Sequence, residues 1–163
     1  MPDMLVKLYE LPLSLDFVAQ AAGGGVVIRK PIGPEKHLVI EWIRRHFNAG
    51  WASEFDASMG HPPFTSFLAT EDNELVGFAC YDATALGIFG PTGVREDRRG
   101  RGIGKALLLA CLTEMKLKGY GYAIIGSVGP AEFYEKSCGA VVIDDSTPSI
   151  WADMLRPKAP GGE

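Results

Sequence analysis

The sequence predicts a mixed α/β fold with one central sheet, and two patterns support this prediction. Two strand patterns, Ser66–Thr70 and Leu75–Tyr81, are separated by a short polar link, which is typical of a hairpin. Farther along, an apolar helix pattern at Gly102–Lys118 lies between strand patterns at Ala85–Gly90 and Tyr122–Gly126. A helix between two strands is a crossover connection, so these two strands are expected to run parallel.

The composition fits a single domain over residues 1–163, with a core of about residues 25–155 and a short flexible tail after residue 156. Of the 163 residues, 47% are hydrophobic, which is enough to bury an ordinary core. The charged fraction of 22% argues against disorder. The longest apolar run, Ala106–Leu112, is far shorter than the roughly 20 residues that span a bilayer. We therefore expect a soluble protein without a membrane partner.

Charge and cysteine usage exclude several function classes. The formal net charge of -4 argues against general nucleic-acid binding and suits a cationic substrate. Three cysteines, an odd number without a C-x-x-C pair, argue against a disulfide framework and a zinc site. The first residues lack a basic start followed by an apolar block, so we expect no secretory signal and a cytoplasmic location.

In the first half of the chain, the helical pattern is clearer than the strands. We expect a leading strand at Met4–Leu13 and a second strand at Val26–Arg29. A helix is expected to begin at Gly33–Pro34 and to end near Asn48–Gly50, and residues 51–63 are expected to be irregular or partly helical. The apolar stripe of this helix consists of Leu38, Val39, Trp42, Ile43 and Phe47.

In the second half, strands and helices alternate. Pro91 and Gly93 follow the strand Ala85–Gly90, and such residues interrupt a ladder and often mark a bulge. The helix that starts at Gly102 is expected to end at Gly119. The remaining expected elements are a short helix and two late strands that pair with each other: Pro130–Cys138, Ala140–Ile143 and Ser149–Leu155.

The stretch RRGRGIGKAL, residues 98–107, alternates glycine with basic residues at a strand-to-helix turn. Glycine in a helix costs about 1 kcal/mol relative to alanine, so three alternate glycines need another reason. The first amides of a helix lack intrahelical partners and carry partial positive charge, which suits a phosphate. Without β-carbons the turn lets a diphosphate approach, and basic side chains neutralise it. The glycines are Gly100, Gly102 and Gly104, and the cations are Arg99, Arg101 and Lys105.

Two other phosphate motifs do not fit this stretch. A Walker loop needs glycine at position 99 and serine or threonine at position 106, where the chain has Arg99 and Ala106. A dinucleotide fingerprint needs glycine at Lys105 and an early βαβ unit, which this mid-chain position lacks. A surface turn with incidental basic residues is the remaining alternative.

The spacing Arg99-x-x-Gly102-x-Gly104 resembles the R/Q-x-x-G-x-G/A signature of the GNAT superfamily of acyl-CoA-dependent N-acetyltransferases. Residues 92–97 are similar to the end of that family's fourth strand, and residues 133–139 to its F-Y-E-K-x-x-G segment. The resemblance covers about residues 25–155. It implies the GNAT fold, a mixed central sheet with flanking helices and a splayed parallel strand pair at the CoA site.

The resemblance also implies how acetyl-CoA is held. Backbone groups of Thr92, Gly93 and Val94 would pair with the pantetheine arm, and the Val94 amide would polarise the thioester carbonyl. Ser127 stands where many relatives carry asparagine, and it would contact the pantetheine. The pyrophosphate would be held by the amides of Arg99, Gly100, Arg101, Gly102, Ile103, Gly104 and Lys105.

Tyr134 occupies the position where many relatives place a tyrosine near the CoA sulfur, which implies a general acid for the departing thiolate. A phenol pKa near 10 and a thiol pKa near 8.5 make full proton transfer uphill by about 1.5 units, so we expect partial donation. The alternative is an aromatic anchor on a short helix. Cys138, one helical turn later, is interpreted as packing, because direct transfer needs no acyl-cysteine.

The general base is left open by the sequence. Some relatives use a glutamate on the fourth strand, but Ala85–Gly90 contains no carboxylate. The candidates on expected loops near the substrate end are Glu54, Asp56, Asp82 and His61, each of which also fits an ordinary surface or structural role.

We interpret the sequence as an N-acetyltransferase that passes the acetyl group of acetyl-CoA directly to a primary amine of a small molecule or peptide, without a metal. Its expected state is a monomer or homodimer. Transfer from another acyl-CoA and a noncatalytic acyl-CoA sensor are the alternatives. Acceptor specificity is expected in residues 47–63 and 146–155, and Trp42, Phe47 and Trp51 either line the acceptor pocket or belong to the core.

Overall fold

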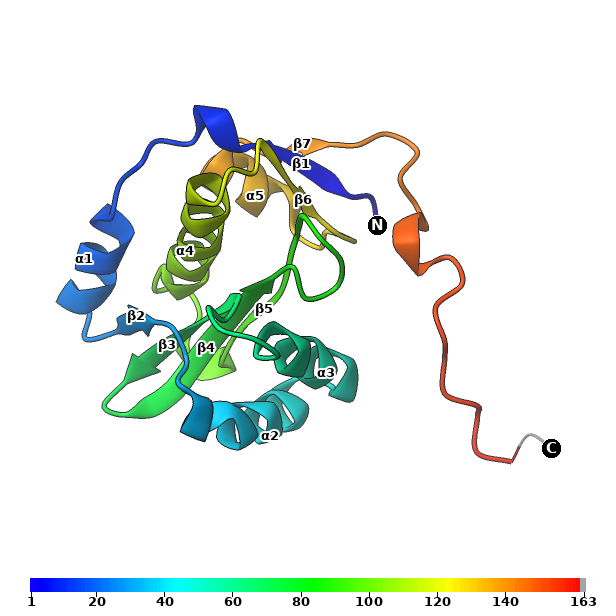
Figure 1. Ribbon diagram of the computed structural model, residues 1–163, viewed down its shortest axis with the longest axis horizontal. Coiled ribbons are helices and arrows are strands. Elements are labelled where there is room, and N and C mark those ends of the chain that lie inside the picture. Colours follow the sequence, from blue (N-terminus) through cyan, green and yellow to red (C-terminus); the bar gives the residue numbers. More distant parts are fainter. Residues whose placement is uncertain (162–163) are drawn as a thin grey trace.

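A seven-stranded mixed sheet forms the centre of the computed structural model, which describes residues 1–161 (Figure 1). Its strands are Met4–Lys7 (β1), Val27–Arg29 (β2), Ser66–Glu71 (β3), Glu74–Tyr81 (β4), Ile88–Val94 (β5), Tyr122–Ile125 (β6) and Val141–Val142 (β7). They lie in the order β2-β3-β4-β5-β6-β1-β7. Among the described residues, β5 and β6 pair in parallel and all other pairs are antiparallel.

Helices cover both faces of this sheet. They are Asp16–Gly23 (α1), Lys36–His46 (α2), Ala49–Ser58 (α3), Ile103–Leu117 (α4) and Ala131–Cys138 (α5). Figure 1 shows α2 and α3 together on one side of the sheet, with α1 and α4 on the other side. The last part of the described chain, in orange and red, runs away from this body.

Strand β4 divides its side chains between two cores. Phe78 and Cys80 pack with α2 and α3, whereas Ala79 and Tyr81 pack with α4. The alternation follows from the pleat of a strand, in which successive side chains point to opposite faces. The buried face of α4 consists of Ile103, Ala106, Leu107, Leu108, Ala110, Cys111, Leu112 and Met115, so the helix is held across the sheet by apolar burial.

Strands β5 and β6 stay together for two residue pairs and then separate. Ile88 pairs with Ile124 and Phe89 with Ile125, and the described residues contain no further β5–β6 pair. On its other edge, β5 stays paired with β4 as far as Val94. One edge of the second half of β5 therefore faces a gap between the two parallel strands.

The predicted hairpin and the predicted parallel strand pair are confirmed. Strands β3 and β4 pair antiparallel, and α4 connects the parallel neighbours β5 and β6. The expected bulge is also present, because the β4–β5 register shifts between Ala79 and Tyr81.

The expected bounds Ala85–Gly90 for this strand are wrong, because β5 begins at Ile88 and continues through Pro91 and Gly93. Gly87, with φ +80°, ends the preceding turn. Pro91 lies at the bulge, where two strands are out of register and a missing N–H disturbs the ladder least.

Two expectations at the N-terminus are corrected. The strand expected over Met4–Leu13 ends at Lys7, because a 3-10 turn follows at Leu8–Glu10 and Pro12 has no N–H to donate. Helix α1 was not predicted, because its eight residues form a weak pattern in which only Phe17 is buried. Strand β1 lies between β6 and β7, so residues before the expected core of 25–155 belong to the sheet.

Two further segments differ from expectation. The stretch expected to be irregular or partly helical contains α3, whose N-cap Asn48 accepts a hydrogen bond from the Trp51 amide at 2.8 Å. The strand expected at Ser149–Leu155 is wrong, because Ser149–Trp151 forms a 3-10 turn. Ser149 has φ +61°, which an extended strand does not allow. The last two residues of the expected tail, 162 and 163, lie outside the described part.

Candidate functional site

A cavity of about 940 Å³ follows the gap between β5 and β6. All seven residues of β5 line it, together with the start of α4 and the turn after β6. Helix α3 contributes Trp51 and Glu54 to its wall, and α5 contributes Phe133 and Tyr134. The cavity therefore joins the splayed strands, the glycine-rich turn and the predicted general acid in one space.

The glycine-rich turn presents the start of α4 to this cavity. Gly100 and Gly102 both have φ +78°, a conformation that residues with a β-carbon rarely adopt. The Gly102 carbonyl accepts the first helical hydrogen bond, from the Ala106 amide at 3.0 Å. No side chain in the described part of the chain caps the helix, so its first amides are available to an anion.

The structure separates the three predicted cations of this turn. Arg99 and Lys105 line the cavity, and Arg99 Nε donates to the Val94 carbonyl at 3.2 Å. The Arg101 side chain does not line this cavity. Its Nη1 contacts Glu71 Oε2 at 3.0 Å, and its Nη2 donates to the Gly24 carbonyl at 3.0 Å.

Glu71 holds the turn from outside the cavity. Its carboxylate accepts from Arg101 and also from Arg98 Nε, at 2.8 Å. These two hydrogen bonds lower the pKa of Glu71, with Arg101 as the larger cause. The network fixes the backbone of the turn, and it leaves Arg99 and Lys105 to face an anion in the cavity.

The predicted pantetheine-binding residues lie along the gap. Thr92, Gly93 and Val94 line the cavity, and their strand is paired with β4 on the opposite edge. Thr92 Oγ1 donates to the Phe78 carbonyl at 3.1 Å. Across the gap, Ser127 also lines the cavity, and its amide donates to Asp3 Oδ1 at 2.9 Å.

Tyr134 lies on α5 with its ring buried between aromatic neighbours. The centroids of Phe133 and Phe89 lie 5.0 Å and 6.5 Å from its ring. Burial, then the nearby Cys138, raises the pKa of Tyr134, so the phenol keeps its proton at neutral pH. Tyr134 lines the cavity, and its hydroxyl is not among the fully buried side-chain polar atoms of residues 1–161 that lack a partner.

Cys138 is the last residue of α5 and lies one helical turn after Tyr134. Its Sγ donates to the Tyr134 carbonyl at 3.2 Å, and burial raises the pKa of this thiol to about 11. A thiol that is protonated at neutral pH is a poor nucleophile, which agrees with a packing role.

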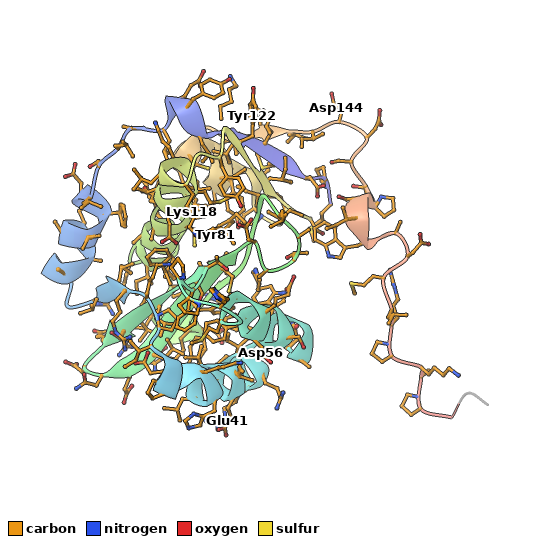
Figure 2. All side chains as sticks on the ribbon, viewed as in Figure 1. Glu41, Asp56, Tyr81, Lys118, Tyr122 and Asp144 are labelled. Atoms are coloured by element: carbon orange, nitrogen blue, oxygen red, sulfur yellow. The ribbon has the colours of Figure 1, made fainter. Side chains whose placement is uncertain are left out.

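Of the four candidate bases, Glu54 lines the cavity, where its Oε1 accepts from Thr84 Oγ1 at 2.5 Å. Asp56 pairs with Lys36 at 2.6 Å, and Figure 2 shows it on the layer formed by α2 and α3. Asp82 accepts from the Gly87 amide at 2.7 Å and from the Tyr120 hydroxyl, so it fixes the turn before β5. His61 is exposed and does not line the cavity.

Thr84 lines the cavity but was not predicted as a site residue, because it carries no motif and is placed by its contact with Glu54 of α3. Trp151 also lines the cavity and lies in the range 146–155 in which acceptor specificity was expected. No motif singled it out, since its position depends on the distant Gly126.

Of the three aromatic candidates, Phe47 and Trp51 line the cavity, with ring centroids 5.0 Å apart. Trp42 packs behind them against Phe78, at 6.4 Å between centroids.

Two further properties concern the described residues 1–161. None of their helices combines the length and apolar character needed to cross a membrane. They also contain no group of three or more histidine, cysteine or acidic side chains placed to hold a metal ion.

Solved structures of known acetyltransferases share this fold. A fungal multi-domain GH3 beta-N-acetylglucosaminidase has a region described as a GCN5-related glucosamine N-acetyltransferase, which matches with a TM-score of 0.70 at 15% identity over 87% of this chain and 19% of that chain. A GCN5-related N-acetyltransferase from Sphaerobacter thermophilus matches with a TM-score of 0.65 at 21% identity, over 87% of this chain and 48% of that chain. A GNAT family acetyltransferase from Brucella melitensis, in complex with acetyl-CoA, matches with a TM-score of 0.54 at 19% identity, over 85% of this chain and 93% of that chain.

The chain therefore corresponds to less than half of each of the first two proteins. No curated protein matches the sequence at a significant level. The sequence profile of the Acetyltransferase (GNAT) family matches residues 35–140, which is more than half of the chain. This range contains β5, the glycine-rich turn, α4 and Tyr134. The protein is accordingly a member of the Acetyltransferase (GNAT) family.

Proposed function

We propose that this protein binds acetyl-CoA between β5 and β6 and transfers the acetyl group directly to a primary amine. The observation that supports this most strongly is the continuity of one cavity along the free edge of β5, from the uncapped start of α4 to Glu54. The acetyl-CoA complex of the Brucella melitensis relative, which has the same fold, also supports it.

The diphosphate and the pantetheine arm of acetyl-CoA would be bound by different residues. The amides of residues 99–105, with the Arg99 and Lys105 side chains, fit the diphosphate by charge and by hydrogen bonding. The free backbone edge of Thr92, Gly93 and Val94 fits the amides of the pantetheine arm, which would add to β5 like a strand. Ser127 would contact that arm from the other side of the gap.

In the proposed reaction the amine nitrogen attacks the thioester carbonyl, a C–N bond forms, and the C–S bond breaks. The Val94 amide stabilises the developing oxyanion. Tyr134 donates a hydrogen bond that strengthens as charge builds on the sulfur, and the sulfur leaves as a hydrogen-bonded thiolate. The thiolate then takes up a proton from solvent, equivalent to the one that the amine releases, and becomes the thiol of CoA. Glu54 accepts the proton of the amine, directly or through water, because it is the candidate base that lines the cavity.

Binding comes first in testing this proposal. Calorimetric titration with acetyl-CoA would compare the natural protein with an Arg99→Ala/Gly102→Asp double variant and with Arg45→Ala. Arg45 is a matched control, because it is an exposed arginine of α2 paired with Glu41 outside the cavity. We expect the double variant to bind at least about 10²-fold more weakly, because it loses a charge-assisted contact and gains a repulsive carboxylate. The control should bind normally.

Turnover is then measured as thiol release from acetyl-CoA with a panel of amines that includes glucosamine, the amine named for the fungal relative. Failure of acetyl-CoA to bind would overturn the proposal. Binding without thiol release from any amine would favour the noncatalytic sensor. A cytoplasmic location and a monomer or homodimer stay predictions.

A further inference from the structure

The charged side chains that line the cavity are divided between its two ends. They are Glu54, Arg98, Arg99 and Lys105. The three cations lie beside the start of α4, at the end of β5. Glu54 contacts Thr84 in the turn before β5, and β5 spans about 20 Å. The end of the cavity that faces away from the diphosphate site therefore presents a carboxylate.

The wall around this carboxylate is mainly apolar. Thr84 contributes a hydroxyl, but it is already bonded to Glu54. The other side chains near this end come from α3, the start of β5 and the turn at Ser149–Trp151: Trp51, Ile88, Phe89 and Trp151. An acceptor with several hydroxyl groups would find few partners here, and each unpaired polar group costs free energy on burial.

Trp151 belongs to this wall because distant segments hold it there. Its ring lies on the backbone at Gly126, where a β-carbon would come within 2.1 Å of the Trp151 Cη2 atom. Ser149, in the same turn, donates from its hydroxyl to Asp3 Oδ2. Asp3 is buried and also accepts from the Ser127 amide, at 2.9 Å. The Asp3 carboxylate thus ties the Trp151 turn to the loop after β6.

We propose that the acceptor is a primary alkylamine with a compact apolar body, such as a phenylalkylamine, and that Trp151 is a specificity-determining residue for it. This inference rests on the proposed function. The ammonium group fits Glu54 by charge, and the apolar body fits the faces of Trp151 and Trp51. Asp3 is a positioning residue, because it acts on the acceptor through the placement of Trp151.

The test measures kcat and KM for phenethylamine and for glucosamine by thiol release at saturating acetyl-CoA. We expect kcat/KM for phenethylamine to exceed that for glucosamine at least tenfold. A tenfold difference is what one unpaired polar group of the acceptor, or one lost aromatic contact, is expected to cause. Trp151→Ala should raise KM for phenethylamine about tenfold, with KM for acetyl-CoA unchanged. Trp151→Phe should recover part of that loss.

Ile150→Ala is the matched control, because Ile150 lies in the same turn, is exposed and does not line the cavity. It should leave both KM values unchanged. A further variant, Asp3→Asn, should raise KM for phenethylamine and leave KM for acetyl-CoA unchanged. Equal or better turnover of glucosamine, or an unchanged phenethylamine KM in Trp151→Ala, would overturn the inference and leave the proposed function standing. Absence of thiol release with every amine would overturn the proposed function and the inference together.

Discussion

At the scale of single residues, Tyr134 is suited to keep its proton and to donate a hydrogen bond with it. Burial raises the pKa of its phenol and keeps it neutral, and Tyr134 lines the cavity. A raised pKa makes the phenol a weaker acid, so complete transfer to a thiolate is even less favourable than for a free tyrosine. The group should therefore act by a hydrogen bond that strengthens during C–S cleavage.

The first prediction concerns this hydroxyl. Tyr134→Phe keeps the ring that packs on Phe89 and Phe133, so acetyl-CoA should bind within about twofold of the natural protein. Loss of the proton donor should lower kcat by about 10²-fold, the lower end of general acid catalysis. Single-turnover thiol release and calorimetry measure the two quantities. Cys138→Ala is the control and should keep its kcat, whereas an unchanged kcat in Tyr134→Phe would remove the tyrosine from the mechanism.

The second prediction concerns Glu54. Glu54→Gln retains an oxygen that can accept from Thr84 but cannot take a proton, so kcat/KM at pH 7 should fall by about 10²-fold. A lysine-like amine with pKa near 10.4 is almost fully protonated at pH 7, and raising the pH supplies more of the free amine without a base. The deficit should therefore shrink between pH 7 and pH 10. A deficit that is constant over this range would argue for a role in binding alone.

At the scale of elements, the start of α4 shows two different reasons for glycine. Gly102 has φ +78°, so the backbone itself requires it. Gly104 lies inside the helix, and a β-carbon there would meet Val94 Cγ2 at an ordinary 3.7 Å. The protein fold therefore does not require glycine at position 104, whereas the diphosphate of the proposed function would need it for close approach.

The third prediction separates these reasons. Gly102→Ala should lower Tm by roughly 2–8 °C, because a left-handed alanine costs about 1–2 kcal/mol. Gly104→Ala should raise Tm by about 1–4 °C, because alanine favours the helix. Both should weaken acetyl-CoA binding about tenfold, the loss of one charge-assisted hydrogen bond. Scanning calorimetry measures Tm for the two variants, and calorimetric titration measures their affinity for acetyl-CoA. Normal acetyl-CoA binding by Gly104→Ala would contradict the diphosphate assignment.

At the scale of the whole molecule, buried thiols and phenols link stability to alkaline pH. Burial raises the pKa of Cys80 and Cys111, and burial with a hydrogen bond to Glu114 raises the pKa of Tyr81. A hydrogen bond to Asp82 raises the pKa of Tyr120 to about 12. Figure 2 shows Tyr81 beside Lys118, whose Nζ lies 5.0 Å from the ring centroid.

The fourth prediction follows from the sign of these shifts. Above about pH 8.5 the unfolded chain loses thiol protons that the native protein keeps, so the free energy of unfolding should fall as pH rises. Each buried thiol contributes a slope of up to about 1.4 kcal/mol per pH unit. Phenols of the unfolded chain add to this above about pH 10. Urea unfolding from pH 7 to pH 10.5 measures the slope, and Cys80→Ala should reduce it. A flat profile would contradict the burial of these thiols.

Local signals were sufficient for the parts of the fold that bind acetyl-CoA in the proposal. The β3–β4 hairpin, the strongly apolar α4 and the Arg99-x-x-Gly102-x-Gly104 turn each carry a pattern within a few residues. Helix α1 and the Ser149–Trp151 turn carry weak patterns. Their conformation is decided by distant partners. Phe17 of α1 packs on Ala106 and Ala110 of α4. Ser149 donates a hydrogen bond to Asp3.

By itself, the sequence determined the fold class, the family signature and the cavity end built from consecutive backbone amides, because backbone geometry follows from neighbouring residues. Only the tertiary structure decided which carboxylate reaches the cavity, where the Arg101 side chain points and what Trp151 covers. Those positions depend on residues that are up to 146 apart along the chain, as for Ser149 and Asp3. Such contacts leave no periodic mark in a sequence, because each depends on how separate elements pack together.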